Sequence, residues 1–269
     1  MSPNSTIPFY FGGGDQPLFG CLHQPAPGAK RQCGVVLSSP FGHEYINSHR
    51  ALRQLATLLA TAGFPVLRFD YYGCGDSLGE ECEASLSRWI EDTSAAISEL
   101  QKRAGLGRVS MIGLRLGATI ATAVAGRRQD IAGLVLWDPV TNGSKFLEET
   151  LLLQKQRMRF RHKPRTSQDV STATTDFLGF ALPSSLREGL AALDISRMLP
   201  LTPEKVLFIA SDPQGKDRCL PQHLVGSAPY ADFQSFMAPR IWEGTPEGTL
   251  LVPAQILRSI VSWMVDKNR

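Results

Sequence analysis

Six short apolar runs recur along the chain, and each is bounded by Gly, Pro or Asp. Most of the stretches between them carry apolar residues at three-and-four spacing, which is the period of a helix with one buried face. Strands that alternate with helices indicate a mostly parallel sheet crossed over by helices, an α/β fold. The expected parallel strands are residues 34–38, 65–69, 108–112, 131–137, 205–210 and 234–238.

The remaining elements are expected around this sheet. A hairpin is predicted over residues 7–24, where a Gly-rich turn at 12–15 separates two apolar segments. Ser48 and Ser85 are expected to cap two helices, the first of which stops at Gly63. Residues 141–199 separate two strands by more than one crossover helix needs, so we expect a helical cap insertion within one domain spanning 1–269.

Composition excludes several classes of function. The net charge is +3, and aromatic residues are not interleaved with basic ones, which argues against a nucleic-acid partner. No basic leader and no run of eighteen apolar residues occurs, so we expect a cytoplasmic protein without a membrane span. The cysteines have no metal-ligand spacing, so we expect reduced thiols, no metal site and no cofactor. They are Cys21, Cys33, Cys74, Cys82 and Cys219.

The motif with most chemical content lies where the run at 108–112 meets a helix of small residues. Gly113, Arg115 and Gly117 form the pattern G-x-R-x-G. This is the nucleophile-elbow pattern G-x-S-x-G with its central residue changed. The glycines are expected because a sharp strand-to-helix turn leaves no room for Cβ atoms, and Arg115 is expected to project into the site.

Other motifs follow the first two parallel strands, and together they carry a resemblance. Pro40, Phe41 and Glu44 follow the first strand, where an oxyanion loop belongs, and residues 70–77 match the turn D-x-x-G-x-G-x-S. The chain resembles the α/β-hydrolase superfamily. It is most similar to the exosortase-A-system-associated hydrolases, which are serine aminopeptidase-like and occur with bacterial exopolysaccharide gene clusters. The resemblance implies an α/β-hydrolase fold and a ligand from exopolysaccharide or lipid metabolism.

A hydrolase triad needs a nucleophile, a base and an acid that orients the base. Only the acid stands in its usual place, as Asp212 after the run at 205–210. Residues 241–244 read Ile-Trp-Glu-Gly where a histidine should follow the last strand. We therefore expect Arg115, Glu44 and Asp212 at the reactive centre. The expected substrate-binding residues are Phe41, Gly42, His43, Cys74, Asp76, Leu116 and Trp242.

A displaced histidine or thiol could still restore catalysis. His43 is the best histidine to face the pocket, while His49 and His23 are assigned to a helix start and to the hairpin. His162 belongs to a basic run and His223 to a loop. Cys74 is the other candidate nucleophile, although nothing near it in sequence would lower the pKa of its thiol.

Arg115 has two interpretations. A buried guanidinium must be paired, and we expect Glu44 to bind it at the floor of the main pocket. Alternatively, its planar fork holds a carboxylate, a phosphate or an oxyanion of a ligand. Basic residues alternate over 155–165 in the expected cap, and they are either a solvated face or a surface for an anionic carrier or saccharide.

Three hypotheses about function remain. The first is a repurposed enzyme that acts on an acyl, ester or saccharide-linked substrate, which is small or carrier-linked, without an elbow serine. The second is a catalytically silent binding or accessory protein that keeps the pocket. The third is an unconventional hydrolase that uses Cys74 or a displaced histidine. The sequence does not determine the oligomeric state.

Overall fold

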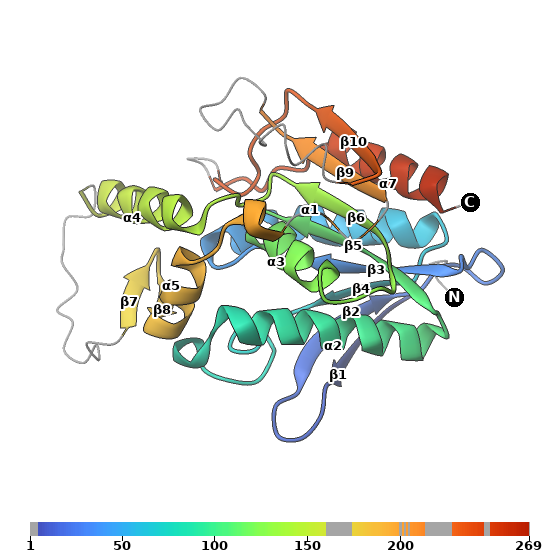
Figure 1. The fold of residues 1–269 in the computed structure, drawn as a ribbon, viewed down its shortest axis with the longest axis horizontal. Coiled ribbons are helices and arrows are strands. Elements are labelled where there is room, and N and C mark those ends of the chain that lie inside the picture. Colours follow the sequence, from blue (N-terminus) through green and yellow to red (C-terminus); the bar gives the residue numbers. More distant parts are fainter. Residues whose placement is uncertain are drawn as a thin grey trace.

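The described residues of the computed structural model are 5–159, 174–198, 201, 203, 205–212, 228–244 and 248–268. They build a central eight-stranded sheet in the order β1-β2-β4-β3-β5-β6-β9-β10 (Figure 1). In this sheet, β4, β3, β5, β6, β9 and β10 pair in parallel, whereas β1 pairs antiparallel with β2 and β2 pairs antiparallel with β4. The bounds are β1 (Thr6–Phe11), β2 (Leu18–His23), β3 (Cys33–Ser38), β4 (Val66–Phe69), β5 (Arg108–Leu114), β6 (Ile131–Trp137), β9 (Lys205–Ala210) and β10 (Tyr230–Ser235).

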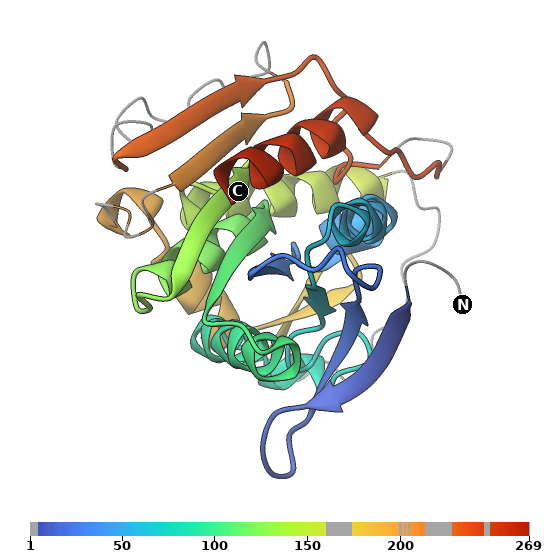
Figure 2. The same cartoon turned by 90° about the vertical axis from the view of Figure 1, so that its right-hand side faces the viewer.

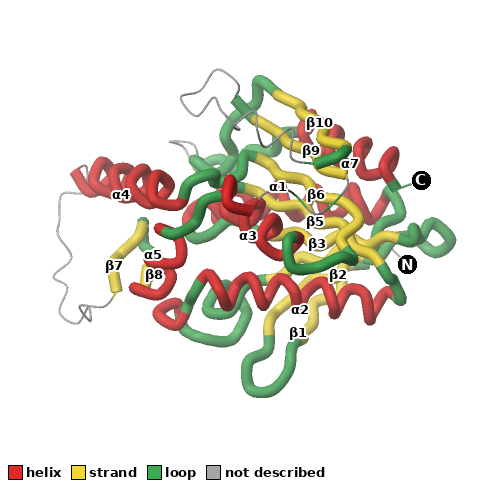
Figure 3. The backbone as a smooth tube through the Cα atoms, viewed as in Figure 1, coloured by secondary structure: helices red, strands yellow, loops and turns green. Residues whose placement is uncertain are grey.

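Helices cover both faces of this sheet (Figures 2 and 3). α2 (Leu86–Ala104) and α3 (Leu116–Ala125) share one apolar core with strand residues such as Met111. α1 (His43–Thr61) and α7 (Ala254–Lys267) share the other with residues such as Ile112. Neighbouring strand residues thus face opposite cores, which explains the unbroken apolar runs. Among the described helices, none combines the length and apolarity that a bilayer crossing requires.

The segment between β6 and β9 contains more than helices. α4 (Gly143–Arg159), α5 (Ser184–Ala191) and the short η2 (Ile195–Met198) are joined by a hairpin of β7 (Thr174–Phe177) and β8 (Phe180–Pro183). The insertion predicted at 141–199 thus contains helices, as expected, and also a hairpin that was not predicted. Leu178 and Gly179 adopt positive φ angles of 57° and 94°, as both residues of a tight hairpin turn do, and this makes the reversal.

Of the two predicted helix caps, Ser85 is confirmed and Ser48 is wrong. Ser85 caps α2 as expected, since its Oγ accepts from the amide of Arg88. Ser48 does not cap a helix, because α1 already begins at His43 and Ser48 Oγ donates to the carbonyl of Glu44 inside it. Gly42, with φ of 61°, supplies the left-handed turn that starts α1 six residues before the predicted cap.

The last strand lies earlier in the chain than predicted. β10 covers Tyr230–Ser235, whereas the apolar pattern had favoured 234–238. Its parallel register with β9 places Tyr230 opposite Lys205 and Ser235 opposite Ala210. β10 ends the order of the described sheet, so it needs no continuous apolar run, and Met237 beyond it is exposed.

Candidate functional site

A sharp turn joins β5 to α3 and places Arg115 between them. The backbone of Arg115 has φ of 55° and ψ of −123°, a conformation that residues other than glycine rarely adopt. A Cβ on Gly113 would lie 2.3 Å from Ala118 Cα, and one on Gly117 would lie 2.2 Å from the carbonyl oxygen of Ser38. The predicted reason for both glycines is confirmed, and we call residues 113–117 the elbow turn.

The guanidinium of Arg115 is held on several sides. Its Nε donates to Glu44 Oε1 at 3.1 Å, and its Nη1 donates to the carbonyl oxygen of Asp138 at 3.4 Å. The ring of Trp242 lies 4.9 Å from the guanidinium carbon, within the range of a cation–π contact. The predicted pairing of Arg115 with Glu44 is confirmed.

The carboxylate partner in this pair, Glu44, is largely buried and lies in the first turn of α1. Its side chain is 11% exposed, against 17% for Arg115. Burial raises the pKa of the Glu44 carboxyl, and the nearby Arg115 cation acts against this increase. Among the described residues, no donor reaches the buried oxygen Oε2. Arg115 is thus the main group that stabilises the ionised form of Glu44.

Asp138 is a site residue that sequence reasoning missed. It follows β6 with φ of 43°, and its carboxylate accepts from the amide of Ser211 at 3.1 and 3.2 Å. Burial raises the pKa of this carboxyl. The sequence indicates Asp138 only by its position, directly after the apolar run that ends at Trp137. Two strained residues, Arg115 and Asp138, therefore end adjacent strands, and such strain clusters at functional sites.

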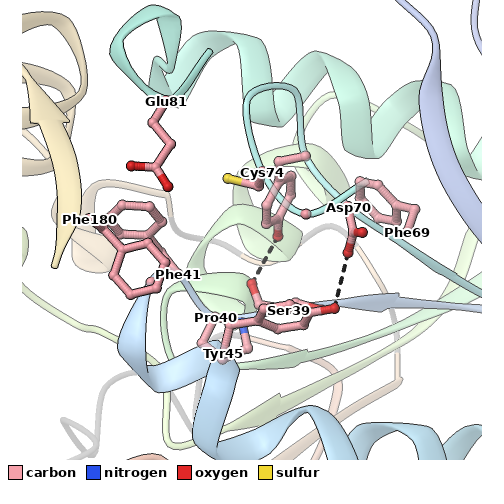
Figure 4. Close-up of a pocket in the computed structure, with 12 residues that line it drawn as sticks. Ser39, Pro40, Phe41, Tyr45, Phe69, Asp70, Cys74, Glu81 and Phe180 are labelled. Carbon is pink, nitrogen blue, oxygen red and sulfur yellow. Dashed lines mark hydrogen bonds between the residues drawn. The ribbon is translucent and has the colours of Figure 1, made fainter. Parts of the chain in front are cut away.

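A pocket opens beside the elbow turn, at the loop that follows β3 (Figure 4). It encloses about 460 Å³ of atom-free space, part of which is open to solvent. We call it the Phe41 pocket. Its described lining is Ser39, Pro40, Phe41, Gly42, Tyr45, Phe69, Asp70, Tyr71, Cys74, Gly75, Glu81 and Phe180.

The Phe41 pocket contains only part of the predicted substrate-binding set. Phe41, Gly42 and Cys74 line it, as expected. Phe180 comes from β8 and Glu81 from η1 (Glu81–Glu83), and sequence reasoning missed both, together with Tyr45 and the pocket role of Asp70. The Glu81 carboxylate accepts from the amide of Ala181 at 2.8 Å, which fixes the β7–β8 hairpin to the pocket rim.

Arg115 and Glu44 do not line this pocket, and the placement of Arg115 at the floor of a main pocket stays a prediction. Glu44, in the first turn of α1, accepts from Arg115 Nε, so the guanidinium is held at this carboxylate and outside the described lining. The elbow turn and the Phe41 pocket are therefore neighbours with separate side chains.

Four more predicted substrate-binding residues lie outside the lining. His43 is the first residue of α1, and Leu116 is buried at the start of α3. Asp76 is exposed, and its amide donates to Asp70 Oδ2 at 3.1 Å. Trp242 is buried against Arg115, because an aromatic face stabilises a partly desolvated cation. These four residues lie outside the Phe41 pocket, and their assignment to substrate binding stays a prediction.

Comparison with known proteins places this geometry in a family. A family model described as serine aminopeptidase, S33, matches residues 30–185, more than half of the chain. This chain belongs to the serine aminopeptidase S33 family. The predicted α/β-hydrolase superfamily and fold are thus confirmed. A search of curated proteins found no match.

Solved structures share the fold of this S33 protein at low sequence identity. Est1E from Butyrivibrio proteoclasticus, solved with ferulic acid, has a TM-score of 0.71 at 16% identity, covering 96% of this chain and 98% of its own. A Pyrococcus furiosus esterase has a TM-score of 0.67 at 15% identity, covering 99% and 92%. Mycobacterium smegmatis proline iminopeptidase has a TM-score of 0.65 at 13% identity, covering 97% and 99%.

Asp212 of the S33 protein does not pair with Arg115 in the structure. Its carboxylate lies 3.7 Å from Arg240 Nε, and Arg240 also bridges to Glu243 at 3.1 Å. This cluster of Asp212, Arg240 and Glu243 follows β9 and β10. Asp212 is therefore in the expected place along the chain, but its ion pair is with Arg240.

Two of the described histidines, His23 and His49, form contacts away from the elbow turn. Arg68 Nε donates to His23 Nε2, and burial together with Arg68 lowers the pKa of His23 to about 4. His49 is exposed inside α1, with its ring nitrogen 2.7 Å from the carbonyl of Ile46, so its assignment to the helix start is wrong. His162 and His223 lie outside the described residues, as do Cys219 and the basic residues of the run after residue 159.

Cys74 lines the pocket as a protonated thiol. Burial, and then the negative charges of Asp70, Glu81 and Asp92, raises the pKa of Cys74 to about 12. A nucleophilic cysteine needs the opposite environment, one that favours the thiolate. The structure thus argues against Cys74 as an attacking group. In the described part of the chain, no three His, Cys, Asp or Glu side chains are grouped to hold a metal.

Proposed function

We propose that this S33 protein binds a small organic ligand in the Phe41 pocket and does not hydrolyse it through a nucleophile on the elbow turn. The observation that carries the proposal is the ion pair between Arg115 and Glu44 at 3.1 Å. Arginine replaces the nucleophilic serine of the family and has no hydroxyl to attack a carbonyl. Because Glu44 and the Asp138 carbonyl hold its guanidinium, Arg115 acts as a structural part of the turn.

The degenerate triad supports the same proposal. The position that follows the last strand carries Trp242 and Glu243 in place of a histidine, and Trp242 packs on Arg115. Asp212, at the acid position, forms an ion pair with Arg240 at 3.7 Å. We therefore favour a binding or accessory protein of the hydrolase fold.

The ligand class follows from the motifs and the pocket. An acyl, ester or saccharide-linked molecule suits a pocket of mostly apolar walls with a few polar groups. The similarity to the exosortase-associated hydrolases supports a ligand from exopolysaccharide or lipid metabolism. We propose that residues 141–199 cap this pocket within one domain, since Phe180 contributes to its wall.

A repurposed enzyme is the second candidate, and one observation favours it. Asp70 lines the pocket, and burial raises the pKa of its carboxyl, as suits a general acid. Its oxygens already accept from the Tyr45 hydroxyl at 3.0 Å and from the Asp76 amide at 3.1 Å. These bonds hold Asp70 within the turn, so the binding function is the stronger candidate.

Hydrolysis of p-nitrophenyl acetate by Arg115→Ser tests this proposal. We expect no turnover above the wild-type rate, because a serine without a base stays protonated and weakly nucleophilic. Turnover that appears in Arg115→Ser and disappears when Asp212→Asn is added would contradict the proposal. It would mean that a histidine reaches the elbow turn and that the triad is intact but for Arg115.

A further inference from the structure

We infer that the Phe41 pocket recognises a compact alkylated ammonium group on its ligand. The inference deepens the proposed binding function, on which it rests, by naming the chemistry that the pocket selects. It follows from two independent properties of the described lining, namely its aromatic rings and the sign of its charges.

The first property is the aromatic wall. Phe41, Tyr45, Phe69, Tyr71 and Phe180 all line the pocket. Phe41 and Phe180 meet edge to face with ring centroids 6.0 Å apart, and Phe69 and Tyr71 do so at 5.2 Å. Such contacts hold the rings in place. An aromatic face attracts a cation through its quadrupole, and this attraction grows when the cation leaves water.

The second property is a uniform sign of charge. Asp70 and Glu81 line the pocket, and its described lining includes no Lys, Arg or His. In Figure 4, Glu81 lies on the side of Phe41 and Phe180, whereas Asp70 lies on the opposite side beside Tyr45. Burial is the main cause of the raised pKa of the Cys74 thiol, which also lines the pocket, and the charges of Asp70 and Glu81 add to it. A cation in this space is attracted from two sides.

Hydrogen bonds hold both carboxylates in place at the pocket wall. Asp70 accepts from Tyr45 and from the Asp76 amide, and Glu81 accepts from the Ala181 amide. Burial raises the pKa of the Asp70 carboxyl, and these two donors act against that increase by stabilising the carboxylate. An alkylated ammonium needs no acceptor and presents methyl groups to the rings.

The same arrangement disfavours an anionic ligand. Arg115 is bound to Glu44 and does not line the pocket, and Arg68, whose charge acts on Asp70 and Tyr45, lies outside the described lining as well. An anion would therefore meet two carboxylates without a compensating charge, which costs free energy in a partly desolvated space. We therefore propose that this pocket binds a cation, and we do not assign an anionic ligand to Arg115 in this pocket.

Titration calorimetry with three probes of similar shape tests the inference on the full chain. The probes are choline, its neutral analogue 3,3-dimethylbutan-1-ol and the anion 3,3-dimethylbutanoate. We expect choline to bind about tenfold more tightly than the alcohol, and the anion to bind more weakly still, because only choline gains both the cation–π and the charge attraction.

Variants locate the binding. Glu81→Gln keeps an acceptor for the Ala181 amide but removes the charge, and we expect it to weaken choline binding about fivefold. Glu91→Gln removes an exposed charge from α2, outside the pocket lining, and should leave binding unchanged. Equal binding of choline and the alcohol, no choline binding, or no effect of Glu81→Gln would each overturn the inference. None of these results requires turnover at the elbow turn, so failure here is distinct from failure of the proposed function.

Discussion

Gly117→Ala is expected to destabilise the protein by about 3 kcal/mol, at the upper end of the usual cost of overpacking. An added Cβ would lie 2.2 Å from the carbonyl oxygen of Ser38 and 2.5 Å from that of Ser39. Both contacts are with backbone, so no side chain can rotate to relieve them. The loop after β3 would have to move away from α3, and this loop carries the pocket residue Phe41. Urea denaturation of the wild type and the variant measures the loss.

Gly126→Ala is the matched control for this prediction. Gly126 ends the same helix with an ordinary helical φ of −66°, and an added Cβ would meet its closest neighbour at 3.7 Å. Alanine there should change stability by less than about 1 kcal/mol. If Gly117→Ala were as stable as Gly126→Ala, the close approach of α3 to the loop after β3 would be wrong.

Arg115→Ala is expected to cost about 2–4 kcal/mol near neutral pH, because it leaves Glu44 buried without its cation. Glu44→Gln added to this variant should recover part of the loss, since the stranded negative charge is then gone. Thermal or urea unfolding of the wild type, both single variants and the double variant gives the coupling energy of the pair. Additive losses would mean that the two side chains do not interact.

The loss caused by Arg115→Ala should also depend on pH. Burial already raises the pKa of Glu44 in the folded protein, and removing Arg115 removes the groups that act against this increase. When the pKa of a carboxyl is higher in the folded protein than in the unfolded chain, where it is about 4.3, folding is favoured at low pH. This stability is fully present below the unfolded pKa and is lost as the pH rises through the folded pKa. The variant should therefore lose less stability relative to the wild type at about pH 4.5 than at about pH 8. A loss that does not change with pH would contradict the role of Glu44.

Much of the fold could be predicted from the sequence because strands buried on both faces appear as unbroken apolar runs. The runs that became β3 to β6 and β9 were located to within a few residues. β10 was misplaced because an edge strand is less covered and lacks such a run. The start of α1 was missed because Gly42 supplies its turn through backbone conformation, which no side-chain pattern indicates.

The site could be predicted only where it depends on local geometry. The elbow turn and the pairing of Arg115 with Glu44 follow from residues at the ends of adjacent strands, which parallel topology brings together. Phe180 and Glu81 were missed because they approach one another from elements about one hundred residues apart in the chain, through the hairpin contact with Ala181. The orientation of the ion pair, away from the Phe41 pocket, depends on packing around Trp242 that sequence spacing does not encode.

The measurement that tests the central claim most directly is labelling with a fluorophosphonate probe, followed by intact mass and peptide mapping. Fluorophosphonates react with serines that a neighbouring base activates, and Arg115 offers no hydroxyl on the elbow turn. Ser38 is buried and hydrogen-bonded to Tyr71, and Ser77 donates to the carbonyl of Asp70. We predict no stoichiometric label on the native protein. Stoichiometric labelling within residues 109–118, or of any serine beside the Phe41 pocket, would contradict the claim that this S33 protein works without a serine nucleophile.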